Sequence, residues 1–175
     1  EKFKTHHYDK TCFEGIYQIP DQMIKEVRMV LRSRLIRHIK HRLADEKSTA
    51  YFTPRQIVEI QDTLRDDILT IGFARRFATY KRAHLLFNNP DRPVQFIFAG
   101  KAHPADQAGQ DLIKRIVEIS KYPQFLGKIL FLPNYDMDLA RHMVQGVDVW
   151  MNTPTRPQEA SGTSGEKAAM NGVMH

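Results

Sequence analysis

The chain of 175 residues is 42% hydrophobic, which is enough for one domain with a sizeable core and excludes a disordered protein. A formal charge of +6 predicts a basic surface, consistent with nucleic acid, phosphate or an acidic partner as ligands. The single cysteine, Cys12, excludes an internal disulfide. No apolar run approaches the roughly 20 residues of a membrane span, so we expect a soluble, cytoplasmic protein.

The first third of the chain is expected to be helical. Apolar residues at four-residue steps predict a long amphipathic helix over residues 20–44. Its other faces are densely basic, which is typical of a helix on nucleic acid or a membrane surface. A solvated face, or one that packs on another domain, is favoured because no aromatic residue is interleaved to stack on bases. The run Thr53-Pro54-Arg55-Gln56 predicts a capping box and a second helix to about Leu64.

Beyond Asp67, short apolar runs alternate with amphipathic segments. The runs predict buried strands over residues 68–74, 94–99, 128–132 and 147–152. Helices are expected between them, over residues 80–87, 106–120 and 138–145. This alternation predicts an α/β fold with a parallel, Rossmann-like sheet of about four strands, in the order 3-2-1-4 if the sheet is doubly wound.

A glycine-rich segment, residues 159–167 (EASGTSGEK), follows the fourth predicted strand. Thr163 is the expected N-cap of a helix, and Glu166 completes a capping box. The unpaired N–H groups at the helix start, beside Gly162 and Gly165, predict a cradle for a phosphate. Lys167 is expected in the first turn, where the helix dipole favours the free amine of a nucleophilic lysine.

The segment has two other possible interpretations, a surface turn and a P-loop. Most Gly/Ser-rich stretches are surface turns with a solvated lysine, and spacing alone favours that interpretation. A P-loop is excluded because Glu166 separates Gly165 from Lys167 and Ala168 follows the lysine.

Three segments decide between these interpretations by their resemblance to the α-glucan phosphorylases. They are residues 152–172 around Lys167, residues 70–82 (TIGFARRFATYKR) and residues 98–104 (FAGKAHP). The resemblance implies transfer of the terminal α-1,4-linked glucosyl unit of a glucan, such as glycogen, starch or maltodextrin, to inorganic phosphate, giving glucose 1-phosphate. It also implies a glycosyltransferase of type B, with two Rossmann domains, and pyridoxal phosphate bound to Lys167 as a Schiff base.

The resemblance assigns roles to individual residues. Arg76 and Lys81 match residues that bind the substrate phosphate. Thr163 and Arg75 match contacts to the cofactor phosphate, although the family usually has lysine at the position of Arg75. The residues that match binders of the glucosyl hydroxyls are Glu159, Ser161 and Gly162.

Other positions depart from the family pattern or receive no role. Glu166 stands where the family usually has methionine, and pairing with Lys167 would keep the amine protonated and oppose cofactor attachment. Lys101 and His103 follow the second strand and are expected to cap a turn. No metal site is assigned.

The predicted strand order brings the two main motifs together. The first and fourth strands become neighbours, so Arg75, Arg76 and Lys81 face the glycine-rich segment across a crevice suited to two phosphates. Residues 1–66 are expected to be a helical extension, and residues 67–175 the first half of the C-terminal domain.

Phosphorylases are several times longer than this chain, so we expect a fragment that lacks the N-terminal domain and is inactive alone. Its short last helix should be frayed because it has little to pack on. A homodimer is a candidate assembly of the whole protein. The alternative is a non-enzymatic basic module that binds phosphate or nucleic acid, with a steep dependence on salt.

Overall fold

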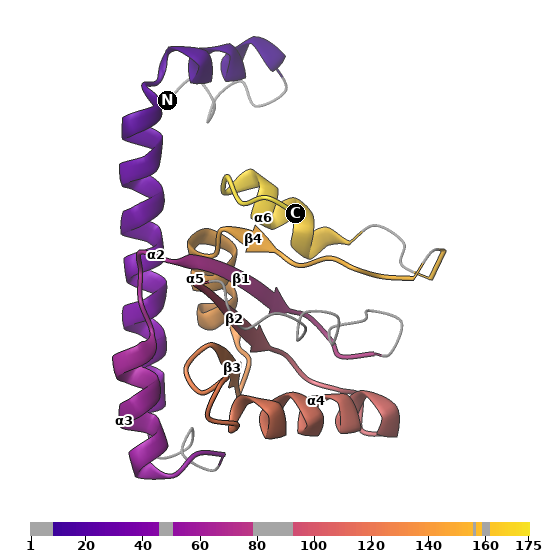
Figure 1. The fold of residues 1–175 in the computed structure, drawn as a ribbon. Helices are drawn as coiled ribbons and strands as arrows, with labels where there is room; N and C mark the ends of the chain where they lie inside the picture. Colours follow the sequence, from indigo (N-terminus) through magenta and orange to yellow (C-terminus); the bar gives the residue numbers. More distant parts are fainter. Residues whose placement is uncertain (1–8, 46–50, 79–92, 156, 159–161) are drawn as a thin grey trace.

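A four-stranded, all-parallel sheet lies at the centre of the fold (Figure 1). The computed structural model describes residues 9–45, 51–78, 93–155, 157–158 and 162–175. The strand order is β3-β2-β1-β4, which confirms the prediction from the sequence. The strands are β1 (Leu69–Ala74), β2 (Val94–Ala99), β3 (Ile129–Leu132) and β4 (Val149–Trp150).

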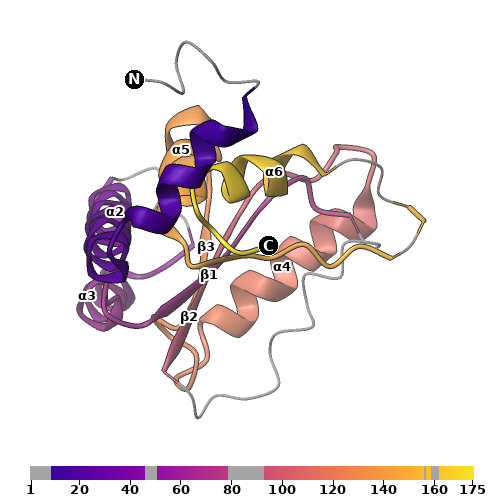
Figure 2. The same ribbon diagram turned by 90° about the horizontal axis from the view of Figure 1, so that it is seen from above.

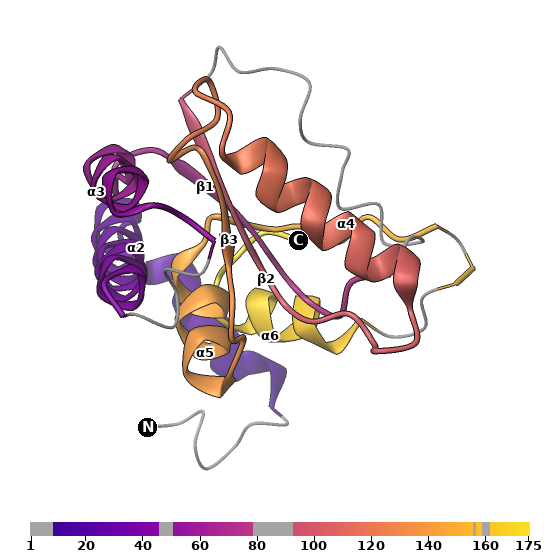
Figure 3. The same cartoon turned by 90° about the horizontal axis from the view of Figure 1, so that it is seen from below.

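Helices cover both faces of the sheet. Helix α4 lies on one face, whereas α2, α3, α5 and α6 lie on the other (Figures 2 and 3). The helices are η1 (Lys10–Gln18, a 3-10 helix), α2 (Asp21–Leu43), α3 (Pro54–Thr63), α4 (Gln107–Ser120), α5 (Met137–Gly146) and α6 (Thr163–Met170). Helix η1 was not predicted, and the helix predicted over residues 80–87 lies outside the described residues.

Alternate side chains of the strands belong to two apolar clusters, one on each face of the sheet. Phe73 and Phe98 pack with Phe77 on the face that α4 covers. Ala74 and Ile97 point to the opposite face, into a cluster shared with α2, α3, α5 and α6. Because each fully buried Leu, Ile or Phe contributes roughly 1.5–3 kcal/mol, both clusters hold the helices on the sheet.

Helix α2 buries only part of its predicted apolar stripe. Leu35, Ile39 and Leu43 are fully buried against the sheet and α5, whereas Met23 and Val27 are 56% and 54% exposed. The four-residue spacing identified the helix but not the point along it where packing begins. Within the described residues, no helix is both long and apolar enough to cross a bilayer.

The start of α3 follows the predicted local pattern. The Gln56 N–H donates to Thr53 Oγ1 at 3.3 Å, and Gln56 Oε1 accepts from the Thr53 N–H at 3.0 Å, so the capping box is confirmed. Pro54 occupies the first helical position, where its missing N–H removes no hydrogen bond.

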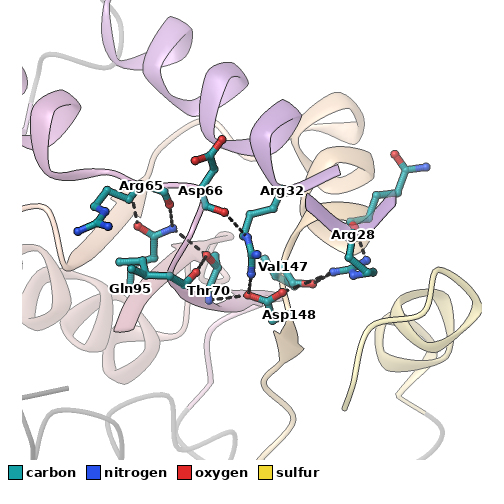
Figure 4. Close-up of polar contacts among 10 residues, drawn as sticks. Arg28, Arg32, Arg65, Asp66, Thr70, Gln95, Val147 and Asp148 are labelled. Atoms are coloured by element: carbon teal, nitrogen blue, oxygen red, sulfur yellow. Dashed lines mark hydrogen bonds and ion pairs between the residues drawn. The ribbon is translucent and has the colours of Figure 1, made fainter. Parts of the chain in front are cut away.

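Two arginines of α2 hold the segment that enters β4 (Figure 4). Arg32 donates to Asp148 Oδ2 at 2.5 Å, and the Thr70 N–H of β1 donates to the same oxygen at 2.9 Å. Arg28 donates to the carbonyl oxygens of Gln145, at 2.7 Å, and Val147. A helix and two strands therefore share one carboxylate, Asp148, which is largely buried.

A second polar chain continues from Thr70 into β2. Gln95 is 1% exposed, and its Nε2 donates to Thr70 Oγ1 and to the Arg65 carbonyl, both at 2.7 Å. A buried amide is tolerated there because both of its donors have partners. The amino ends of β1 and β2 are thereby joined on the side of the sheet that faces α2.

We expect Asp148→Ala to lower the free energy of unfolding by about 2–3 kcal/mol, because it leaves Arg32 and the Thr70 N–H without their shared acceptor. Urea unfolding measures the loss. Asp111→Ala is the control, since Asp111 forms only exposed contacts on α4. Equal stabilities of the two variants would contradict the proposed importance of Asp148.

Candidate functional site

Arg75 and Asn152 follow the carboxyl ends of the neighbouring strands β1 and β4 and contact each other. Arg75, which directly follows β1 and is 8% exposed, donates from Nη1 to Asn152 Oδ1, two residues beyond β4. A Cβ built on Gly162 would lie 3.6 Å from Asn152 Nδ2 and 3.9 Å from Arg75 Nη2. The structure therefore brings Arg75 beside Gly162, in a sheet with the predicted strand order.

The chain that follows β2 packs against the backbone of Arg75 and Phe77. Gly100 has a φ of 141°, and a Cβ there would lie 2.0 Å from the Arg75 carbonyl oxygen. The Phe77 N–H donates to the Lys101 carbonyl at 2.9 Å, and Phe77 pairs with Ala102. Only glycine fits this approach of two backbones, which fixes the position from which the Arg75 side chain departs.

Only some of the other residues singled out in the sequence lie within the described part of the chain. Arg76 is exposed beside Arg75. His103 accepts from the Ala105 N–H at 3.1 Å and so caps a turn, as expected. The remaining expected residues, Lys81, Glu159 and Ser161, lie outside the described residues.

Helix α6 begins differently from the prediction. Its N-cap is Gly162, in the left-handed region with φ of 64°, and no side chain caps the helix. The predicted capping box of Thr163 and Glu166 is therefore wrong. An N-cap side chain can reach the N–H groups two or three residues ahead only from an extended backbone, whereas Thr163 is already the first helical residue.

Lys167 is the fifth residue of α6 and not a residue of its first turn. The effect of the helix dipole falls off beyond that turn, so the predicted help from the dipole is largely lost. Lys167 and Glu166 are both exposed, and among the described residues no ion pair joins them. The pairing considered from the sequence does not form here.

The carboxyl end of α6 is anchored rather than frayed. The Val173 N–H donates to the Ala168 carbonyl at 3.0 Å and the Gly172 N–H to Ala169 at 2.9 Å, with Gly172 at φ of 73°. This Schellman motif brings the buried Val173 onto the buried Ala168. The next residue, Met174, then accepts from the Trp150 N–H at 2.7 Å. The helix that carries Lys167 is thus tied to the edge of the sheet.

Lys167 borders a cavity of about 680 Å³ between α5 and α6. Tyr135, Trp150 and Ser164 line the same cavity. Trp150 Nε1 and Ser164 Oγ are buried there without a hydrogen-bond partner in the protein. Buried polar groups are nearly always paired, so two unpaired polar atoms in the wall of one cavity are unusual.

Tyr135 lines the cavity next to the end of β1. Its hydroxyl lies 3.4 Å from the Ala74 carbonyl oxygen, at the end of β1. Burial, with the nearby Asp136 carboxylate, raises the pKa of Tyr135, so the phenol stays protonated and can donate. Sequence reasoning missed Tyr135, Trp150 and Ser164, because no local pattern marks residues that meet only through packing.

Comparison with known proteins identifies the family of the chain. The sequence model described as carbohydrate phosphorylase matches residues 18–175. The chain belongs to the carbohydrate phosphorylase family.

Individual phosphorylases are also similar to the chain. A glycogen phosphorylase of Aquifex aeolicus is 45% identical over 100% of the chain, and a maltodextrin phosphorylase of Thermococcus litoralis is 44% identical over 92%. A glycogen phosphorylase of Mycobacterium bovis is 41% identical over 95% of the chain. The chain spans 27% of the length of the first relative and 20% of the length of the other two.

We expect Gly100→Ala to destabilise this phosphorylase chain by about 3 kcal/mol, because the new Cβ meets the Arg75 carbonyl in a backbone conformation that suits glycine. Thermal or urea unfolding measures the loss. Gly15→Ala is the matched control, since nothing lies within 4 Å of its new Cβ. A loss no larger than that of the control would contradict the backbone contact.

Proposed function

We propose that this chain supplies the cofactor lysine and part of the phosphate site of an α-glucan phosphorylase. The observation that carries the proposal is Lys167, which borders a cavity with two unpartnered buried donors and lies on the helix that starts beside Arg75. Its relatives are named glycogen and maltodextrin phosphorylases. The reaction is transfer of a terminal α-1,4-linked glucosyl unit to inorganic phosphate, which yields glucose 1-phosphate.

The residues of the cavity fit pyridoxal phosphate. Lys167 offers the amine for covalent attachment, and Trp150 Nε1 and Ser164 Oγ offer donors that no protein atom satisfies. Gly162, with no side chain at the start of α6, lets an anion approach the free N–H groups there. When bound, the cofactor supplies a phosphate that exchanges a proton with the substrate phosphate.

The chain's own cations hold the two phosphates. Arg75 is fixed toward Gly162 by Asn152 and by the backbone of Gly100, so its charge is already oriented before ligands arrive. We assign the substrate phosphate to Arg76 and Lys81, and the cofactor phosphate to Arg75 and Thr163. Such prearranged charge stabilises the transition state without reorganisation, which is how phosphate clamps accelerate transfer.

The sugar side of the site is assigned to the segment before α6. Glu159, Ser161 and Gly162 bind the glucosyl hydroxyls in this proposal, with Gly162 also close to the substrate phosphate. The position of Gly162 between Asn152 and Arg75 supports this assignment, because it brings the sugar segment to the phosphate cations.

The rest of the phosphorylase completes the enzyme. We propose that residues 1–66 form the helical extension and residues 67–175 the first half of the C-terminal Rossmann-like domain. The exposed apolar half of α2, around Met23 and Val27, suits packing against the N-terminal domain. The isolated chain is then inactive. Dimerisation and a cytoplasmic location stay predictions.

The alternative basic module is less well supported. Three basic side chains of α2 are used inside the molecule: Arg28 and Arg32 bind around Asp148, and Arg42 bonds to Asp136 at 2.8 Å. Because these arginines bind groups of the same chain, α2 has fewer basic side chains available to bind nucleic-acid phosphates.

The cofactor assignment is tested on the whole phosphorylase by borohydride reduction and peptide mass spectrometry. We expect a phosphopyridoxyl group on Lys167, and its loss in Lys167→Arg, which keeps the charge but removes the reactive amine. Lys101→Arg is the control and should remain labelled on Lys167. Label on another lysine would refute the assignment.

The role of Arg76 is tested by phosphorolysis of a maltodextrin. Arg76→Gln should lower kcat/KM for phosphate by about 100-fold or more, because a charge that clamps the transferring phosphate is lost. Arg115→Gln removes an exposed charge on α4 and should leave the rate unchanged. A wild-type rate in the Arg76 variant would remove this residue from the phosphate site.

A further inference from the structure

Two histidines and an aspartate gather where α2 crosses α5, and the aspartate also borders the Lys167 cavity. They are His38 of α2 and Asp138 and His142 of α5. One potential ligand atom of each lies within 4.8 Å of those of the other two. Asp138 and His142 are four residues apart and so share one face of the helix, which is directed at α2.

A histidine nitrogen and a carboxylate oxygen of this cluster face each other without a hydrogen bond between them. His38 Nε2 is buried with no hydrogen-bond partner and lies 3.7 Å from Asp138 Oδ2. Arg141 holds the other carboxylate oxygen, Oδ1, at 2.7 Å, which leaves Oδ2 directed at His38. An unpartnered buried nitrogen facing a carboxylate is unusual in a helix interface, and a bound cation explains it.

The tautomer of His142 suits metal binding. The Asp138 carbonyl can only accept, so the 2.9 Å contact of His142 Nδ1 with it assigns the proton to Nδ1 and leaves the Nε2 lone pair available. Metal-binding histidines commonly donate their second N–H to a carbonyl in this way.

We propose that His38, Asp138 and His142 form a binding site for a divalent transition-metal ion, with Zn²⁺ as the best match. Two imidazoles and one carboxylate are a donor set typical of Zn²⁺, and three protein ligands leave a fourth position for water. Tetrahedral zinc requires ligand atoms about 3.3 Å apart with lone pairs that converge on the ion. The two rings are stacked in parallel, 4.1 Å between centroids, so binding requires at least one imidazole to turn out of the stack and direct its lone pair at the ion.

The ion would act as a clamp between α2 and α5. Its ligands come from both helices, and α5 also carries Arg141 and Val144 in the wall of the Lys167 cavity. A ligand that binds only the folded protein stabilises it by a free energy that grows with the logarithm of the free ligand concentration above the dissociation constant. The site therefore predicts that Zn²⁺ raises the melting temperature.

The test titrates ZnCl₂ into the whole protein after EDTA treatment, by calorimetry and in phosphate-free buffer. We expect one ion per chain, with affinity lowered more than about 100-fold in Asp138→Asn and in His142→Ala. His41→Ala is the control, since His41 is an exposed histidine of α2, the helix that carries His38, and it should bind as wild type. Absence of binding, or equal binding by all variants, would overturn the proposal.

A second measurement does not depend on the folding of variants. X-ray absorption of the zinc-loaded wild-type protein should show a shell with two imidazoles and oxygen ligands. A shell without imidazole, or with sulfur, would refute the site. Replacement by Co²⁺ should give the visible absorption of a tetrahedral ion in wild type and His41→Ala, and a purely octahedral spectrum would equally refute it.

Discussion

The Asp148 carboxylate joins elements that the rest of the structure depends on. The ladder between β1 and β4 comprises two residue pairs, with backbone hydrogen bonds from the Asp148 N–H to Thr70 and from the Met151 N–H to Gly72, both at 2.8 Å. Asp148 adds the bond from the Thr70 N–H and the ion pair with Arg32, while Arg28 binds the carbonyls just before it. Because β4 leads directly to Asn152, these bonds determine where Asn152 meets Arg75.

Close backbone packing completes this arrangement. A Cβ on Gly72 of β1 would lie 2.7 Å from Val147 Cγ1, so the small residue allows the segment before β4 to approach the sheet. Gly100 does the same for the Arg75 carbonyl on the other side of β1. Helix α2, which shares a core with the sheet, therefore helps to position Arg75 and Asn152 although it contributes neither residue.

Local patterns were predictable where a few neighbouring residues decide the structure. The Thr53–Gln56 capping box and the strand order follow from such patterns and from the doubly wound rule. The start of α6 was not predictable in the same way, because Gly162 and Thr163 are both acceptable caps and the path of the preceding chain decides between them. The apolar run before Asn152 likewise indicated a longer strand than the two residues of β4.

The candidate sites depend on contacts between elements far apart in sequence. Trp150 and Ser164 look unremarkable in sequence, and only the packing of α5 and α6 leaves their polar atoms unpartnered beside Lys167. Helix α5 is common to both sites, because Asp138 borders the Lys167 cavity and also faces His38 of α2. A rigid helix transmits a shift of either face to the other, so the seating of α2 on α5 sets the shape of the cavity wall opposite Lys167.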